Sequence, residues 1–227
     1  MLNIVVCMKQ VFDPEAPAST FRVDPEAMRA LPPKGSPPVV SPFDANALEA
    51  ALKIKDNQDA KVTVLSVGAS LAKPVMQQTL ASGADKLILM QDEAFNALDG
   101  VATARVLAAG IRKLESVDQV LCGRQSSDTN AGAVGPLLAE ILGAPCVPFA
   151  RRVELVDGHI EVERETRAGF EVVAADLPAL VTVSSDVGEL RLPTVKASMK
   201  ARKKKVPKWR AADLDVDPAA LRRLDLV

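Results

Sequence analysis

The chain has 227 residues, 48% of them hydrophobic and 25% charged, and its formal net charge is -1. These values are typical of a folded globular protein and exclude a disordered or membrane-embedded chain. The sequence has one histidine, no tyrosine and none of the serine-hydrolase, zinc-protease, P-loop or GxGxxG patterns, so any redox or transfer activity must come from a bound cofactor.

The first apolar run, residues 3–8, is predicted to be a strand. It is too short to cross a bilayer and lacks the charged start and cleavage site of a signal peptide. The three cysteines, Cys7, Cys122 and Cys146, lie in apolar runs without metal-ligand spacing. We therefore expect buried thiols in a cytoplasmic protein that does not insert into a membrane.

Strand-like and helix-like runs alternate through the first two thirds of the chain, which predicts a twisted parallel sheet with helices on both faces. The expected elements are strand 3–8, helix 43–54, strand 61–67, helix 72–81, strand 86–90, helix 101–114, strand 118–121 and helix 134–142. Ligands of such sheets bind beyond the carboxyl ends of the strands. Residues 7–9, 66–68 and 123 onward are therefore expected to share one site.

After residue 145 the apolar pattern changes to a period of two. The alternation over 153–162, interrupted by the turn pair Asp157-Gly158, predicts a hairpin, and strands 171–174 and 179–183 are expected to continue the same antiparallel extension. Residues 1–186 are thus predicted to form one nucleotide-binding domain. Residues 187–227, with their basic run and prolines, are expected to form a C-terminal arm on the surface or on another chain.

The loop after strand 118–121 carries the clearest functional signal. From Gly123 to Val134 it consists of small and polar residues, and it leads into a helix. Small residues let backbone N–H groups surround an anion, and the start of a helix adds about half a positive charge. The same residue types also form ordinary helix caps. The loop alone is therefore compatible with a phosphate-binding loop or with a polar turn.

Four motifs, in the same order, make the chain resemble the β subunit of an electron transfer flavoprotein. The most specific is VERE at 162–165 with Glu171 and LPALVT at 177–182; the others are MKQVFD at 8–13, SPFD at 41–44 and ASMKARKKK at 197–205. The resemblance covers about residues 2 to 210. It implies an adenine-nucleotide α-hydrolase-like, Rossmann-like α/β fold.

The resemblance also implies a function. The chain would pair with an α subunit that holds most of a redox-active FAD, and would itself bind AMP or, in the electron-bifurcating type, a second FAD. The heterodimer would carry electrons from flavin dehydrogenases to a quinone reductase or another acceptor. The chain would be a carrier subunit rather than an enzyme, with no catalytic residue and no metal.

The candidate contacts form two groups. The candidate nucleotide contacts are Cys7, Lys9, Ser41, Pro42, Phe43, Asp44, Val67, Gly123, Arg124, Gln125, Ser126, Ser127, Asp128, Thr129, Asn130, Ala131, Gly132, Ala133 and Val134. The candidate partner contacts are Thr194, Val195, Lys196, Met199 and Lys200. Arg164 also resembles a residue at the subunit interface.

Several positions depart from the family pattern. Ala133 and Val134 stand where a Gln-Thr pair usually reaches the phosphate, so backbone groups must bind it and the affinity or the ligand is expected to differ. Ser41 replaces a more frequent asparagine, which removes a donor–acceptor pair. Val195 is a shorter anchor than the usual leucine, which predicts a different or weaker dehydrogenase partner. The chain stops soon after Leu226, so the extension that embraces the α subunit is expected to be short.

Two alternatives concern the nucleotide loop and the basic run. One alternative is a stand-alone adenine-nucleotide-binding module or hydrolase of the same fold. It is motivated by the loop and by the absence of polar residues at positions 133 and 134. The basic run 200–205 could suit nucleic acid, but only Trp209 is nearby for base stacking, so we expect no nucleic-acid partner. We expect the run to steer acidic partner surfaces instead.

Overall fold

The computed structural model describes residues 1–26 and 29–221. Within these residues, nine strands form one sheet in the order β11-β10-β9-β12-β8-β1-β6-β7-β13. The strands are β1 (Leu2–Cys7), β6 (Ala60–Gly68), β7 (Lys86–Gln91), β8 (Gln119–Gly123), β9 (Cys146–Val156), β10 (His159–Thr166), β11 (Gly169–Asp176), β12 (Ala179–Val183) and β13 (Lys208–Trp209). All neighbours from β9 to β13 in this order pair parallel, and β10 pairs antiparallel with both β9 and β11. The predicted α/β fold is confirmed.

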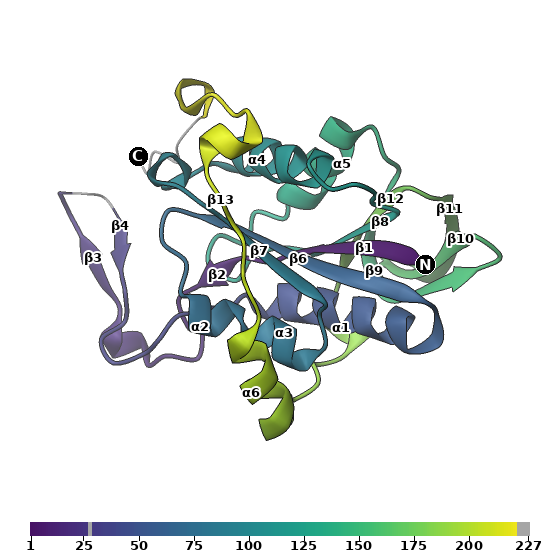
Figure 1. Ribbon diagram of the computed structural model, residues 1–227, viewed down its shortest axis with the longest axis horizontal. Helices are drawn as coiled ribbons and strands as arrows, with labels where there is room; N and C mark the ends of the chain where they lie inside the picture. Colours follow the sequence, from purple (N-terminus) through teal and green to yellow (C-terminus); the bar gives the residue numbers. More distant parts are fainter. Residues whose placement is uncertain (27–28, 222–227) are drawn as a thin grey trace.

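Helices cover both faces of the sheet, as Figure 1 shows. One face carries α1 (Pro42–Asn57), α2 (Lys73–Met76), α3 (Gln78–Ser82) and α6 (Val195–Lys203), and the other carries α4 (Gly100–Arg112) and α5 (Val134–Leu142). Successive strand side chains point to opposite faces. Ile4 and Val6 of β1 therefore join one core cluster, and Val5 and Cys7 join the other. The central parallel strands are buried on both sides, as parallel sheets require, whereas β11 at the antiparallel end is mostly exposed.

The expected helix over 72–81 is interrupted. The structure has two short helices there, α2 and α3, with Gln77 between them. Thr79 Oγ1 donates a hydrogen bond of 2.7 Å to the carbonyl of Met76. Side-chain hydrogen bonds of this kind compete with the helix ladder. The apolar period alone did not reveal this local competition.

Strand β12 corrects the predicted extension. It was expected to be antiparallel, but it pairs parallel with both β8 and β9, and all five of its residues are buried. A continuous apolar run is typical of a central parallel strand. The antiparallel part consists of β9, β10 and β11. The turn between β9 and β10 is confirmed: Asp157 and Gly158 have φ of 48° and 87°, as a two-residue hairpin turn needs.

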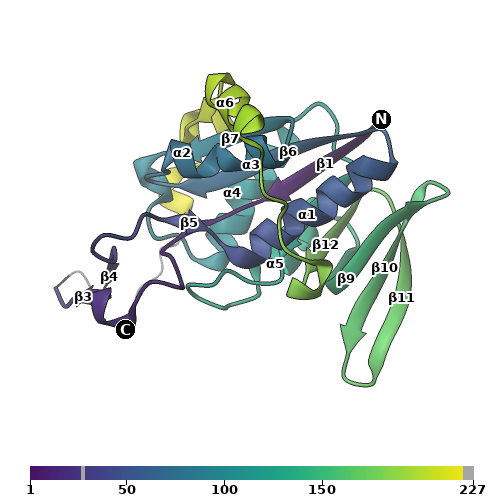
Figure 2. The same cartoon turned by 90° about the horizontal axis from the view of Figure 1, so that it is seen from below.

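The segment between β1 and α1 lies beyond the carboxyl ends of the strands. There β2 (Gln10–Val11) pairs with β5 (Val39–Val40), and β3 (Arg22–Asp24) pairs with β4 (Arg29–Leu31). Figures 1 and 2 show the β3–β4 hairpin standing away from the sheet. Short 3-10 helices complete the described chain at Ala18–Thr20, Glu93–Phe95, Ser185–Val187, Ala211–Leu214 and Pro218–Ala220.

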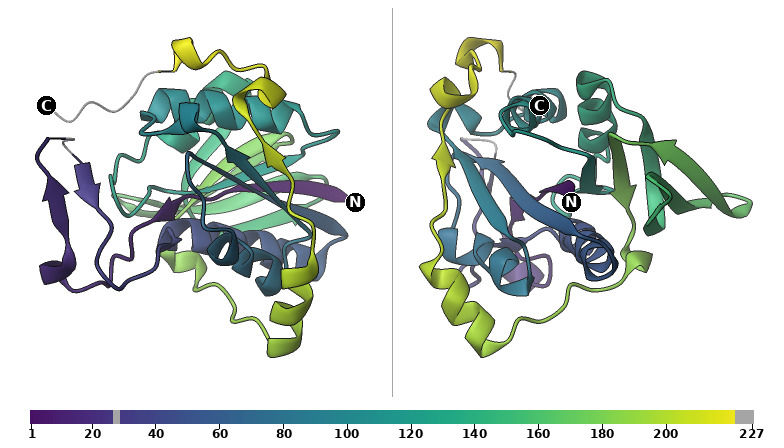
Figure 3. Two further views of the ribbon diagram at one scale, coloured as in Figure 1. Left: turned by 60° about the vertical axis from the view of Figure 1, so that its left-hand side comes forward. Right: turned by 45° about the vertical axis from the view of Figure 1, so that its right-hand side comes forward.

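The segment after β12 packs on its own chain. It contains the 3-10 helix Ser185–Val187 and runs along α1 to α6. It then forms β13, the edge strand of the sheet next to β7 (Figure 3). β13 pairs with β7, and Ala201 of α6 is buried in the core. The arm therefore connects one helical face to the other. Residues 222–227, with the expected short extension after Leu226, lie outside the described residues.

Candidate functional site

The carboxyl ends of β1, β6 and β8 meet at one edge of the sheet, which we call the carboxyl edge. β1 pairs with β6 on one side and with β8 on the other, and Cys7 lies level with Leu65 and Cys122. The chain builds β6 and β7 first and then returns to add β8 and β12, so the strand order reverses at β1. Such a switch point is where open α/β sheets bind their ligands.

Asp44 joins the start of α1 to two strand ends. Its Oδ2 accepts a hydrogen bond of 2.8 Å from the N–H of Lys9, and its Oδ1 accepts one of 3.1 Å from the N–H of Gly123. Burial raises the pKa of Asp44 to about 7, against the two hydrogen bonds, which lower it. The carboxyl group of Asp44 thus connects the start of α1 to the ends of β1 and β8.

Gly123 allows the end of β8 to touch α1. A Cβ atom at this position would lie 2.6 Å from Oδ1 of Asp44 and 2.6 Å from the carbonyl carbon of Phe43. Real Cβ atoms essentially never approach so closely, so only glycine fits without a shift of the backbone. The SPFD motif and the loop glycine, 79 residues apart, therefore form one unit.

The residues before and at the start of α1 lie close to the loop. Ser41 is fully buried, and its N–H donates to the carbonyl of Lys9 at 2.9 Å. Pro42 occupies the first turn of α1, where its missing N–H costs nothing. The guanidinium group of Arg124 lies over the ring of Phe43, and its Cζ is 5.2 Å from the centroid of the ring. This contact brings the helix start and the loop together.

The loop after β8 is held by its own polar groups. Gln125 Nε2 donates to Asn130 Oδ1 at 3.0 Å, and the hydroxyls of Ser126 and Thr129 lie 3.0 Å apart. Asn130 and Gly132 both have positive φ, 51° and 63°. Asparagine and glycine tolerate this conformation best. The sequence of small and polar residues thus produces a tight, ordered bend.

Lys9 joins this loop to β1. Its Nζ lies 2.7 Å from Oδ2 of Asp128. Burial acts to raise the pKa of Asp128, but the hydrogen bond and charge of Lys9, together with hydrogen bonds from Ser126 and the N–H of Thr129, hold the pKa below its usual value. The pair crosses the carboxyl edge from β1 to the loop.

The first N–H groups of α5 have no side-chain cap. The residue before the helix is Ala133, which makes no cap hydrogen bond, and Ala131 and Gly132 are exposed. The first backbone donors of a helix have no partner within it, and they favour an anion. A Cβ at Gly135 would lie 2.5 Å from Cγ2 of Thr182, so α5 begins in close contact with β12.

Buried polar atoms without a hydrogen-bond partner gather at the carboxyl edge. Among the described residues, five such atoms lie there: Ser41 Oγ, Ser66 Oγ, Gln91 Oε1, Arg124 Nε and Ser127 Oγ. Elsewhere in the described chain only Gln119 and Arg164 have them. Leaving such a group unsatisfied costs about 1–3 kcal/mol, so a cluster needs an explanation. The residues fit a polar ligand that would supply the missing partners.

Gln91 was missed by the sequence reasoning. It is the last residue of β7, beside Gly68 of β6. The only signal available was its position, a polar residue directly after a run of buried apolar ones. Ser66, by contrast, falls within the predicted range 66–68.

The predicted partner contacts lie elsewhere, on α6. Thr194 caps this helix, accepting a hydrogen bond of 3.1 Å from the N–H of Ala197. Three apolar side chains on α6 or just before it are open to solvent: Leu192 is 93% exposed, Val195 79% and Met199 60%. We call these three residues the apolar patch. The lysines around it are Lys196, Lys200 and Lys203.

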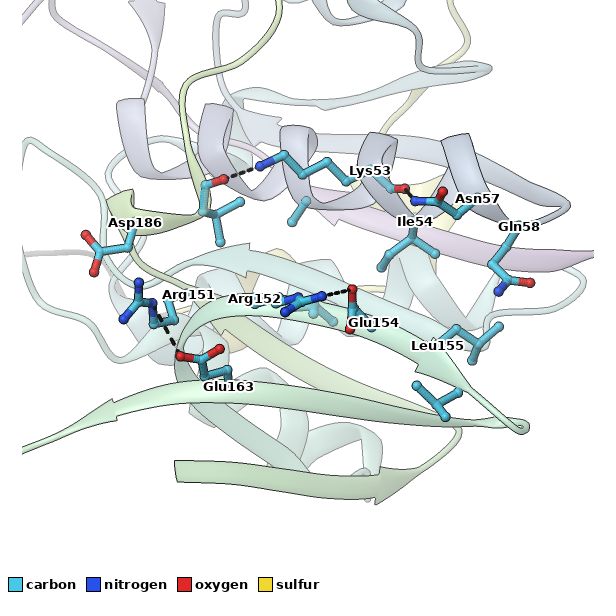
Figure 4. Close-up of a pocket in the computed structure, with 14 residues that line it drawn as sticks. Lys53, Ile54, Asn57, Gln58, Arg151, Arg152, Glu154, Leu155, Glu163 and Asp186 are labelled. Atoms are coloured by element: carbon cyan, nitrogen blue, oxygen red, sulfur yellow. Dashed lines mark hydrogen bonds and ion pairs between the residues drawn. The ribbon is translucent and has the colours of Figure 1, made fainter. Parts of the chain in front are cut away.

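A groove of about 700 Å³ lies between α1 and β9–β10, and Figure 4 shows it. None of the predicted nucleotide contacts lines it. Four of its charged groups form two ion pairs: Arg152 lies 2.7 Å from Glu154, and Arg151 lies 3.7 Å from Glu163. Lys53 donates to the carbonyl of Val187, and none of the described residues that line the groove has a fully buried polar atom without a partner. The groove therefore lacks the unpartnered groups that mark the carboxyl edge.

Among the described residues, no helix is long and apolar enough to cross a membrane. No group of three or more His, Cys, Asp and Glu residues in the same part of the chain could hold a metal ion. The thiols of Cys7 and Cys122 are buried and free, and Cys146 is partly buried. The hydrogen bond with Cys7, together with burial, raises the pKa of Cys122.

The fold and the carboxyl edge define a parallel α/β protein with a candidate ligand site at its topological switch point. Residues 34–214 match the electron transfer flavoprotein domain. The chain is 40% identical to electron transfer flavoprotein subunit beta of Clostridium acetobutylicum, covering 97% of this chain and 83% of the relative, and 37% identical to that of Megasphaera elsdenii, covering 97% and 82%. It is 36% identical to CarD of the caffeyl-CoA reductase-Etf complex of Acetobacterium woodii, covering 96% and 82%. The chain belongs to the electron transfer flavoprotein β-subunit family.

Proposed function

We propose that this chain binds AMP or a second FAD at the carboxyl edge and pairs with an α subunit that holds the main FAD. The heterodimer would carry electrons from a flavin dehydrogenase to a quinone reductase or another acceptor. The bound flavin would supply the electron-transfer chemistry. The observation that carries the proposal is the cluster of unpartnered buried polar atoms at the switch point of an electron transfer flavoprotein fold. The cytoplasmic location stays a prediction.

The chain's own groups would bind and orient the nucleotide. Backbone N–H groups from Ala131 to Val134 would donate to phosphate, since α5 has no side-chain cap. The N–H of Asn130, which was expected to join them, instead donates to the carbonyl of Ser126 at 2.9 Å. Cys7, Ser41 and Val67, with Phe43, would contact the adenine and ribose. The Lys9–Asp128 pair would hold the loop against β1. None of these groups needs to react, which suits a carrier subunit.

The partner contacts follow from the exposed surfaces. We assign the apolar patch, with Thr194, Lys196 and Lys200, to the flavin dehydrogenase. Apolar side chains surrounded by lysines suit a partner surface with an apolar pocket and an acidic rim. We assign Arg164 on β10 to the interface with the α subunit. The name of the relative CarD places that protein in a reductase complex, and a comparable complex is proposed here.

The test is co-expression with a candidate α subunit, followed by a visible spectrum and a count of nucleotides released on denaturation. One flavin per heterodimer would indicate AMP or no nucleotide in this chain, and AMP in the supernatant would separate these cases. Two flavins would indicate the bifurcating type. A pure complex without flavin would overturn the proposal.

A second candidate function is a stand-alone adenine-nucleotide-binding module or hydrolase. The uncapped start of α5, with Ala133 and Val134 in place of polar residues, favours it. In that case the isolated chain would be a stable monomer that binds ATP and does not associate with a flavoprotein. Size-exclusion chromatography with and without the α subunit distinguishes the two.

A further inference from the structure

One face of α1 holds the segment that leads to α6. Asn46 Nδ2 donates to the carbonyl of Gly188 at 2.6 Å, and Lys53 Nζ donates to that of Val187 at 2.5 Å. Asn46 and Lys53 are seven residues apart, so they lie on the same side of the helix. The chain between β12 and α6 is therefore attached along the helix rather than hanging free.

Arg191 makes the strongest of these attachments. Its Nη2 lies 2.9 Å from Oε1 of Glu49 and 2.7 Å from Oδ2 of Asp56, and its Nη1 lies 3.1 Å from Oδ1 of Asp56. Its backbone N–H also donates to Glu49 Oε2 at 3.0 Å. Both the main chain and the side chain of one residue are thus fixed to α1.

The chemistry of this cluster depends on arginine. The side chain of Glu49 is only 8% exposed, so its charge needs a close partner. A guanidinium group presents several donors in a rigid plane and can bind two carboxylates at once, which a lysine cannot do. The hydrogen bond from Arg191 also holds the pKa of Asp56 below its usual value.

The apolar patch begins at the next residue. Leu192 follows Arg191 directly, and Thr194 then caps α6, which carries Val195 and Met199. Side chains this exposed are not oriented by packing within their own chain. Their placement depends on the backbone, which is fixed by Arg191 before Leu192 and by the packing of α6, whose Ala201 is buried in the core, after it.

We infer that Arg191, held by Glu49 and Asp56, is a positioning residue that sets the apolar patch in place before a partner arrives. A surface fixed in advance loses less conformational freedom when it binds. The inference rests on the proposed function, in which the patch meets a flavin dehydrogenase. It adds residues that contact no partner themselves and act through the patch.

The first test measures the attachment without any dehydrogenase. In the heterodimer, Arg191→Lys and Glu49→Gln should accelerate hydrogen exchange of the amide at position 191 by about tenfold or more, because this N–H donates to Glu49 Oε2 and the fixed backbone opens locally. The matched control is Arg152→Lys, the same substitution in an exposed pair with Glu154. It should leave exchange at position 191 unchanged. Unchanged exchange in Arg191→Lys would overturn the inference.

The second test uses a flavin dehydrogenase chosen because it reduces the wild-type heterodimer. Arg191→Lys should raise KM for the heterodimer about tenfold and leave kcat unchanged, since Arg191 is proposed to position the docking surface and not to take part in electron transfer. A purely structural role would lower stability without this change in KM. Faster exchange with an unchanged KM would overturn the positioning role.

A third variant covers the case in which Arg191→Lys fails to fold. Asp56 is more exposed than Glu49, so Asp56→Asn removes one partner of Arg191 without leaving a charge buried. It should raise KM about threefold, and an unchanged KM would count against the inference. Failure of the proposed function is recognised separately, from the wild type alone: if no flavin dehydrogenase reduces it, both ideas fall.

Discussion

The carboxyl edge and the apolar patch are incomplete in opposite ways. The edge buries polar atoms for which the described chain supplies no partner, whereas the patch exposes apolar side chains that no described segment covers. A small polar ligand can complete the first, and only another macromolecule can complete the second. In the proposed function the two regions therefore serve different steps, nucleotide binding at the edge and partner docking at the patch.

Both regions are held in place by residues of α1. Asp44 in its first turn holds the ends of β1 and β8, and Glu49 and Asp56 further along hold Arg191. One helix thus supports the candidate nucleotide site at its start and the segment leading to the apolar patch along its length. Substitutions in one region should leave the other intact, and the Gly132→Glu and Val195→Ser predictions below test this independence.

The largest effect is expected for Gly132→Glu. A carboxylate in the bend beside α5 would repel phosphate, so we expect the nucleotide to be lost from the purified heterodimer, with at least about thirtyfold weaker binding. Gly132→Gln is the control, because it has the same shape and the same strain at φ 63° without the charge. Nucleotide content in Gly132→Glu equal to that of the wild type would show that the loop does not bind phosphate, and a loss in Gly132→Glu but not in Gly132→Gln would assign the effect to the charge. Partner docking should not change in either.

Gly123→Ala should cost about 2–3 kcal/mol of the free energy of unfolding, because the new Cβ overlaps the backbone at Phe43. The control is Gly68→Ala, at the end of β6, where the nearest atom is the movable Cδ2 of Leu71 at 3.1 Å. This variant should lose less than about 1 kcal/mol. Urea denaturation measures both. Similar losses of unfolding free energy in the two variants would mean that the backbone of β8 and α1 can shift to accommodate a Cβ atom at position 123.

The fold was largely predictable from the sequence because its signals are local. The loop boundary and the apolar period placed α5 at Val134–Leu142, where the structure has it. For β12 the predicted residues were right and the predicted pairing was wrong. The period-two pattern of the segments before it suggested an antiparallel strand, whereas β12 is a central strand that pairs parallel with β8 and β9. Which strands pair is decided by contacts distant in sequence, and no local pattern reports them.

The candidate site was predictable only in part. The resemblance supplied the SPFD motif and the loop, but not the joint that Asp44 makes with Gly123, 79 positions away. Arg191 and Glu49 are 142 positions apart and belong to no motif. Such pairs arise when the folded chain returns on itself, so only the structure shows them.

Asp44→Asn should change how stability depends on pH. The folded pKa of Asp44 is about 7, above its ordinary value of 3.8, so between these values the folded state holds a proton that the unfolded state lacks. The stability that this bound proton contributes to the wild type is therefore present at low pH and is lost as the pH rises toward 7. Relative to Asp44→Asn, wild-type stability should fall by about 1–2 kcal/mol between pH 5 and pH 7 in urea titrations. A constant difference would mean that Asp44 is ionised throughout.

The smallest effect on stability, and the most specific, is expected for Val195→Ser in the apolar patch. The side chain is 79% exposed, so the free energy of unfolding should change by less than about 0.5 kcal/mol. KM for the dehydrogenase should nevertheless rise about threefold, because a small apolar anchor is lost from the interface. Val172→Ser is the matched control, the same change at a 67% exposed position on β11. If the control raises KM equally, the dehydrogenase meets the antiparallel extension as well as α6. Nucleotide content should stay at the wild-type value in both variants, because the carboxyl edge does not depend on the patch.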